Sequence, residues 1–254
     1  MGLFFDFLFE RRRTTIPQPH HFVCMLTAAE PISITVSEGT RVSGLLQKPP
    51  RARACYVLAH GAGAGMDHPF MEGVASGLAS RGIATLRYQF PYMERGTRRP
   101  DPPPLAQATV RAAVAAAQRL VPNMPLIAGG KSFGGRMTSQ AQAKAPLQGV
   151  HGLAFLGFPL HPAGRPSQDR AEHLFEVQIP VLFLQGTRDN LASLDQLKPV
   201  CKQLGKRATL TLFADADHSF HVPARTGRKD AQVLDDILDA LAAWLDSVIL
   251  RPGK

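Results

Sequence analysis

The stretch that decides the fold of this chain is Gly130-Lys131-Ser132-Phe133-Gly134. It follows a short apolar run at residues 125–129 and precedes a helix-like run at 135–144. A G-x-S-x-G pattern between a strand and a helix is typical of a nucleophile elbow, a sharp turn that exposes a serine hydroxyl above a sheet. Side chains at the flanking glycines would collide with neighbouring backbone. We therefore expect Ser132 to be a nucleophile at a helix N-terminus, where developing negative charge is favoured.

On both sides of this stretch, strand-like and helix-like segments alternate along the chain. This alternation predicts an α/β fold with a mostly parallel eight-stranded sheet and helices on both faces. The segment at 157–179 is short, so no large cap is expected. The expected strands are 32–36, 42–47, 54–59, 83–87, 125–129, 150–156, 180–184 and 208–213, and the expected helices are 70–81, 105–120, 135–144, 171–177, 194–204 and 229–249.

The length of 254 residues predicts one α/β domain, at 31–250, preceded by a poorly structured tail at 1–30. An alternative start at Met25 would remove most of this tail. Its apolar residues precede its basic cluster, the reverse of a signal peptide, and its phenylalanines leave open a weak membrane-surface role. No run of eighteen apolar residues occurs, so no membrane span is expected.

The formal charge of +9 comes from Lys and Arg residues scattered along the whole chain. This pattern favours a basic, solvated surface over a binding surface for nucleic acid or anionic membrane, because no nucleic-acid motif accompanies it. Cys24, Cys55 and Cys201 are widely spaced and match no zinc or redox pattern. They indicate a reducing compartment, and we expect a cytoplasmic protein with a small-molecule substrate and no nucleic-acid partner.

Two further residues complete a catalytic pattern with Ser132. Asp189 follows the seventh expected strand and His218 follows the eighth, which gives the chain order Ser, Asp, His. This order is associated with the α/β-hydrolase sheet, whose ligand sites lie beyond the carboxyl ends of the strands. Each residue also has a structural reading: a helix cap for the serine, a turn residue for the aspartate and a solvated side chain for the histidine. Their shared position at strand ends favours a triad.

Acyl transfer also requires N–H donors for the oxyanion. We expect these donors to be the backbone N–H of Phe133, directly after the nucleophile, and that of Ala62 in the glycine-rich loop after the third expected strand. In the same loop we expect His60 to shape the backbone. His60, Asp67 and His68 do not form a convincing metal cluster, and no H-E-x-x-H pattern occurs.

The glycine-rich segment at 61–65 does not predict a cofactor site. Its glycine spacing is not G-x-G-x-x-G, and the following strand ends in Arg87 instead of an acidic residue. A P-loop is excluded as well, because Pro125 stands where its first glycine would be. No cofactor is expected.

At these residues the chain resembles the α/β-hydrolase superfamily, over residues 32–250. It is most similar to the small, cap-poor branch related to dienelactone hydrolase, and within it to the branch with Tex-type proteins and a subunit of the NSL histone-acetylation complex. The resemblance implies the triad described above. The segments that carry it are Leu58-Ala59-His60-Gly61-Ala62-Gly63, Gly129-Gly130-Lys131-Ser132-Phe133-Gly134-Gly135-Arg136, Gly157-Phe158-Pro159-Leu160-His161-Pro162, Gln185-Gly186-Thr187-Arg188-Asp189 and Ala216-Asp217-His218-Ser219-Phe220.

One departure from that branch bears on the substrate. Dienelactone hydrolases use a cysteine nucleophile, whereas this chain has Ser132, so dienelactone specificity is not expected. Lys131 and Arg136 flank the serine and Arg188 precedes the aspartate, which suggests the hypothesis that one of them favours an anionic substrate group.

The sequence thus predicts a serine hydrolase that cleaves a carboxylic ester through an acyl-enzyme on Ser132, with a thioester or amide as less favoured substrates. Two alternatives stay open. A catalytically silent hydrolase-like domain could serve as an interaction module, or the same triad could support acyltransferase or haloperoxidase chemistry.

Overall fold

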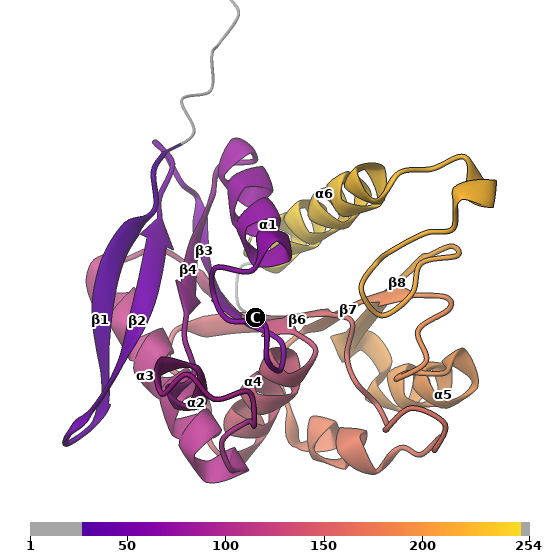
Figure 1. Ribbon diagram of the computed structural model, residues 1–254, viewed down its shortest axis with the longest axis horizontal. Helices are drawn as coiled ribbons and strands as arrows, with labels where there is room; N and C mark the ends of the chain where they lie inside the picture. The colour runs from indigo at the N-terminus through magenta and orange to yellow at the C-terminus, as the bar shows by residue number, and fades with distance from the viewer. Residues whose placement is uncertain (1–26, 250–254) are drawn as a thin grey trace, which may run out of the picture.

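The computed structural model describes residues 27–249 (Figure 1). The expected tail therefore lies outside the described residues except for 27–30, of which Glu30 already begins the first strand. The strands are β1 (Glu30–Ser37), β2 (Thr40–Gln47), β3 (Ala54–Ala59), β4 (Ile83–Tyr88), β5 (Leu126–Lys131), β6 (Val150–Leu156), β7 (Val181–Gly186) and β8 (Ala208–Phe213). The α-helices are α1 (Pro69–Ser80), α2 (Pro91–Glu94), α3 (Pro103–Leu120), α4 (Phe133–Lys144), α5 (Leu194–Leu204) and α6 (Asp230–Ile249), and the short 3-10 helices are η1 (Asp169–Glu176), η2 (Gly205–Arg207) and η3 (Ala224–Thr226).

The eight strands form a single sheet in the order β1-β2-β4-β3-β5-β6-β7-β8. β2 runs antiparallel to both of its neighbours, and all other pairs are parallel. The three strands that precede the predicted triad residues therefore run in the same direction. Their carboxyl ends meet at one edge of the sheet, as expected for ligand sites in open α/β sheets.

Helices cover both faces of the sheet (Figure 1). The buried strand β3 shows how the sequence allows this, because its alternate side chains point to opposite faces. Cys55 and Val57 belong to the core that includes α3 and α4, whereas Tyr56 and Leu58 belong to the core that includes α1 and α6. A strand buried on both faces reads as a continuous apolar run, which is the pattern of residues 54–59.

The expected architecture is confirmed: an α/β-hydrolase fold with an eight-stranded, mostly parallel sheet and no large cap. The expected hairpin and strands are present, as are five of the six expected α-helices, with ends that differ by at most two residues. The 3-10 helices η2 and η3 were missed, as was the short helix α2, in a segment expected to be a loop. Proline stands at its first position, where no intrahelical N–H is lost, but four residues carry too little periodicity to reveal a helix.

The expected helix at 171–177 is instead the 3-10 helix η1. Among residues 27–249 no helix is both long and apolar enough to cross a membrane.

Candidate active site

The turn after β5 has the geometry of a nucleophile elbow. Ser132 has φ 49° and ψ −114°, a combination of backbone angles that residues other than glycine rarely adopt. The turn is tight, since a Cβ on Gly130 would lie 2.1 Å from the carbonyl oxygen of Ala59, and one on Gly134 would lie 2.6 Å from that of His60. Only hydrogen fits at these two positions, so the glycines of the motif are required by the close approach of β3.

His218 lies between the other two predicted triad residues. Its Nε2 is 2.8 Å from the hydroxyl oxygen of Ser132, and its Nδ1 is 2.6 Å from Oδ2 of Asp189. Because the carboxylate can only accept, Nδ1 carries the proton, and Nε2 is free to accept from the serine hydroxyl. The three residues come from the ends of β5, β7 and β8, so the sheet brings together positions up to 86 residues apart.

The carboxylate of Asp189 is held by two donors besides His218. Its side chain is 0% exposed. The backbone N–H of Leu191 donates to Oδ1 at 2.8 Å, and the Gln185 side-chain amide donates to Oδ2. The amide oxygen of Gln185 accepts in turn from the N–H of Phe158 at 2.9 Å. Gln185 was missed as a site residue, although a polar residue in the apolar run of β7, four positions before Asp189, is a signal that could have revealed it.

The predicted oxyanion donors belong to two different segments of the site. Phe133 is the first residue of α4, where the backbone N–H has no intrahelical acceptor. Ala62 lies in the loop after β3. In that loop Ala64 donates to the carbonyl of Gly61 and Gly63 donates to the hydroxyl of Tyr92. The N–H of Ala62 has no acceptor among residues 27–249 and is therefore available to a ligand.

His60 is buried and shapes its loop. Its Nε2 accepts from the N–H of Phe90 at 3.1 Å, and its Nδ1 lies 2.7 Å from the carbonyl oxygen of Gly61. This pattern requires the neutral ring with the proton on Nδ1. Burial lowers the pKa of His60 from 6.5 to about 4, so the ring stays neutral at physiological pH.

Lys131 turns toward the histidine of the site. Its ammonium nitrogen is 2.5 Å from the main-chain carbonyl oxygen of His218 and 5.4 Å from the ring centre of Phe220. Burial lowers the pKa of Lys131 from 10.5 to about 8, although the negative charges of Asp189 and Asp217 oppose this shift.

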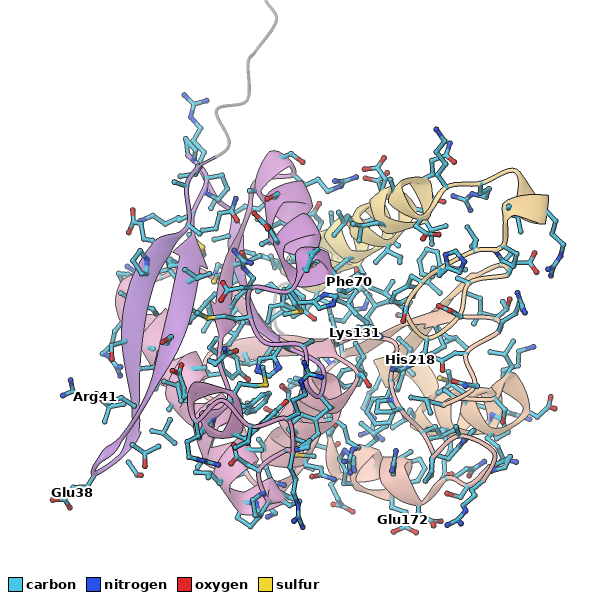
Figure 2. All side chains as sticks on the ribbon, in the orientation of Figure 1. Glu38, Arg41, Phe70, Lys131, Glu172 and His218 are labelled. Atoms are coloured by element: carbon cyan, nitrogen blue, oxygen red, sulfur yellow. The ribbon has the colours of Figure 1, made fainter. Side chains whose placement is uncertain are left out.

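A cavity of about 390 Å³ opens above the serine. Three of its lining residues, Phe70, Lys131 and His218, lie close together (Figure 2). Its walls are mostly apolar. The lining residues are Gly61, Ala62, Ala64, His68, Phe70, Met71, Lys131, Ser132, Leu191, His218 and Ser219.

The other basic residues singled out in the sequence do not line this cavity. The side chain of Arg188 is exposed, and that of Arg136 packs near Arg170 and His173. A substrate-binding role for Arg188 therefore has no contact in its favour and stays a prediction. Lys131 is the member of the basic group that the cavity includes.

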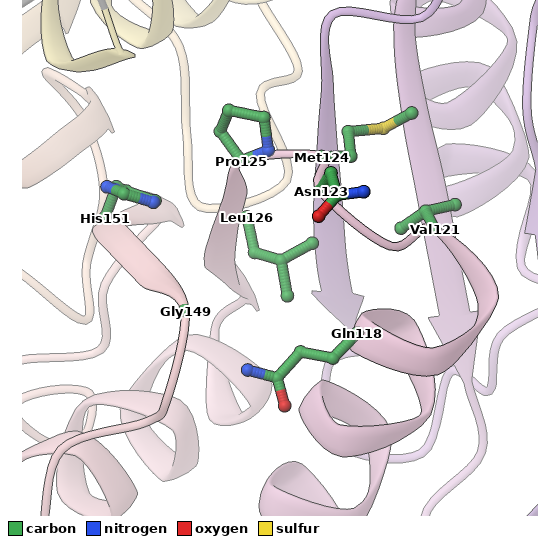
Figure 3. Close-up of a pocket in the computed structure, with 8 residues that line it drawn as sticks. All are labelled: Gln118, Val121, Asn123, Met124, Pro125, Leu126, Gly149 and His151. Carbon is green, nitrogen blue, oxygen red and sulfur yellow. The ribbon is translucent and has the colours of Figure 1, made fainter.

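A second cavity, of about 310 Å³, lies at the opposite end of β5 (Figure 3). It is lined by the end of α3, the segment that enters β5, and the start of β6, with His151 at its edge. It is separate from the triad, because Ser132 follows the other end of the same strand. Among the described residues, no three His, Cys, Asp or Glu side chains lie close enough to hold a metal ion.

The fold is that of an α/β hydrolase, and the side chains of Ser132, His218 and Asp189 lie in hydrogen-bond contact at its strand ends. Residues 52–246 match the family described as alpha/beta hydrolase domain, and the chain belongs to this family. The further resemblance to Tex-type proteins and the NSL-complex subunit stays a prediction.

Solved structures share the fold at low sequence identity. A dienelactone hydrolase from Anabaena variabilis has a TM-score of 0.72 and 21% identity, with 88% of this chain and 99% of that chain covered. A serine hydrolase without a lid from Xanthomonas campestris has a TM-score of 0.67 and 20% identity, covering 86% and 95%. Est1E from Butyrivibrio proteoclasticus, in a structure with bound ferulic acid, has a TM-score of 0.69 and 16% identity, covering 87% and 100%.

Proposed function

We propose that this protein is a serine hydrolase that cleaves a carboxylic ester through an acyl-enzyme on Ser132. The observation that carries this proposal is the position of His218, whose two ring nitrogens lie 2.8 Å from the Ser132 hydroxyl and 2.6 Å from the Asp189 carboxylate. A histidine with a purely structural role would not require a strained serine, with φ 49°, in contact with its second ring nitrogen.

In the first half of the reaction, the hydroxyl oxygen of Ser132 attacks the ester carbonyl carbon while Nε2 of His218 takes its proton. Asp189 keeps the ring in the required tautomer and stabilises the imidazolium. The backbone N–H groups of Phe133 and Ala62 donate to the carbonyl oxygen as it becomes negative. The proton on Nε2 then passes to the departing alcohol oxygen, and the acyl group stays on Ser132.

In the second half, a water molecule gives a proton to His218 and attacks the acyl carbon. The carboxylic acid leaves as the proton returns to Ser132. The cavity above the serine suits a small acyl or aromatic group, because Phe70, Met71 and Leu191 form its apolar walls. The neighbour with bound ferulic acid supports an aromatic acid among the first esters to be tested. Lys131 is the candidate for contact with an anionic substituent, and the cytoplasm is the expected compartment.

The test is covalent labelling of the purified protein with a fluorophosphonate. We expect one adduct on Ser132, none in Ser132→Ala, and a much slower reaction in His218→Ala. His151→Ala is the matched control, because this exposed histidine lies by the cavity at the far end of the sheet, and it should react like the wild type. An ester panel would follow.

A folded wild-type protein that does not react would contradict the proposal and favour the interaction-module alternative. Acyl transfer would show itself if added alcohols diverted the acyl group from water during ester turnover.

A further inference from the structure

The loop that carries the second predicted oxyanion donor is held by the segment that follows β4. This loop, residues 60–66, contains glycine at positions 61, 63 and 65, which gives its backbone unusual freedom. Three hydrogen bonds join it to this segment: from Phe90 N–H to His60 Nε2 at 3.1 Å, from Gly63 N–H to the Tyr92 hydroxyl at 3.0 Å, and from Met66 N–H to Gln89 Oε1 at 2.8 Å.

Tyr92 contacts both halves of the predicted oxyanion hole. Its hydroxyl accepts from Gly63, the residue after Ala62, so it fixes the peptide next to one donor. Its ring meets that of Phe133, the residue of the other donor, edge to face at 6.4 Å and 88°. Tyr92 does not line the cavity, so it would act on the reaction through these neighbours and not through the substrate.

Tyr92 is itself fixed by a contact outside the loop. Its backbone N–H donates to Oδ2 of Asp101 at 2.9 Å. The Asp101 side chain is 1% exposed and pairs with Arg95 at 2.6 Å. The short helix α2 is thus tied down at its start, which fixes the position from which the Tyr92 hydroxyl reaches Gly63.

We propose that Tyr92 is a positioning residue of the oxyanion hole, whose hydroxyl holds the Gly63 peptide so that the N–H of Ala62 faces the substrate oxygen. This inference rests on the proposed function. Oxyanion donors accelerate a reaction because they are oriented before charge develops, and a glycine-rich loop does not hold such an orientation by itself. The Tyr92 hydroxyl, which accepts the hydrogen bond from Gly63, restrains the loop in that orientation.

The test compares Tyr92→Phe with Tyr88→Phe. Both variants lose one buried phenolic hydroxyl, but the hydroxyl of Tyr88 lies toward Thr138 and makes no hydrogen bond to the loop. In Tyr92→Phe we expect faster amide hydrogen exchange at Gly63, a kcat roughly fivefold lower, as for the loss of one hydrogen bond, and an unchanged KM for the ester. Phosphonylation of Ser132 should slow by a similar factor. Tyr88→Phe should leave all four quantities at the wild-type values.

Two results would overturn the inference. Unchanged exchange at Gly63 in Tyr92→Phe would show that the hydroxyl does not hold the loop. Faster exchange with an unchanged kcat would show that the restraint has no part in catalysis. Failure of the proposed function looks different, because the wild type would then fail to react with fluorophosphonate while exchange at Gly63 still differed between the two variants.

Discussion

The ammonium group of Lys131 donates a hydrogen bond to the main-chain carbonyl oxygen of His218 at 2.5 Å. The residue before the predicted nucleophile thus holds the backbone of the predicted general base. This contact joins the end of β5 to the loop after β8, in addition to the bond between Ser132 and His218. Lys131 therefore has a structural reason to be at this position that is independent of any substrate charge.

Lys131→Met should lower kcat by roughly tenfold, because a hydrogen bond from a charged group to the His218 backbone is lost. The measurement is steady-state turnover of a neutral ester. Lys144→Met is the control, since this lysine is exposed at the end of α4, and it should behave as the wild type. A normal kcat in Lys131→Met would contradict the positioning role. An effect confined to the KM of acidic esters would favour direct contact with an anionic substrate.

The same variant should change how stability depends on pH. The pKa of Lys131 falls from 10.5 in the unfolded chain to about 8 in the native state, because burial disfavours the charged form. Between these values the unfolded chain binds more protons, so this group makes the free energy of unfolding rise with pH. Denaturation from pH 7 to 11 should show that the wild type gains stability relative to Lys131→Met mainly between pH 8 and 10.5. If the free energies of unfolding of the two proteins changed with pH in parallel, the lowered pKa of Lys131 would be contradicted.

Gly157→Ala should impair the site more than its backbone strain explains. Gly157 has φ 71°, and a Cβ there would lie 3.0 Å from the Lys131 ammonium and 3.4 Å from the His218 ring. Gly164 has φ 69°, and an added Cβ there would have no atom within 4 Å. Gly164→Ala therefore introduces the same backbone strain as Gly157→Ala without the crowding. Both variants should lose about 1 kcal/mol of stability in denaturant titrations. Only Gly157→Ala should lower kcat, and equal kcat values would refute the predicted crowding.

Gln185→Leu should destabilise the protein by about 1–3 kcal/mol, because it leaves the buried N–H of Phe158 without an acceptor. It should also lower kcat, because Asp189 loses a donor that orients it. Gln142→Leu is the matched control, since its side chain also accepts from a buried N–H, that of Leu147, at a distance from the triad. We expect similar shifts in denaturation midpoint for the two variants. A normal kcat in Gln185→Leu would exclude a role in orienting Asp189.

Ser132→Gly should be more stable than Ser132→Ala by about 1 kcal/mol, the reverse of the usual order in and around helices. Both variants lose the hydroxyl, but only glycine adopts φ 49° without strain. The strain that glycine relieves exceeds the free energy that its greater backbone freedom in the unfolded chain costs. Thermal or urea denaturation of the inactive pair would measure the difference. A less stable glycine variant would show that the elbow stores no strain.

The amino-acid sequence predicted the order of strands and helices along the chain, the tight turn at Ser132 and the three side chains that lie together at the site. These depend on local patterns that can be read without knowledge of distant contacts. Apolar runs such as 54–59 indicate strands, spacing of three and four indicates helices such as α6, and glycines on both sides of Ser132 indicate a tight turn. In a parallel sheet the carboxyl ends share one edge, so the sequence also predicted that Ser132, Asp189 and His218 lie at the same edge.

Which side chains support these residues depends on how distant segments pack in the folded protein. Gln185 holds Asp189, Tyr92 holds the loop of Ala62, and Lys131 turns toward the His218 carbonyl instead of toward solvent. None of these contacts follows from a period or a motif, because each joins side chains from separate segments whose directions depend on how turns and short helices pack. The charge of Lys131 was visible in the sequence, but its burial and its partner were not.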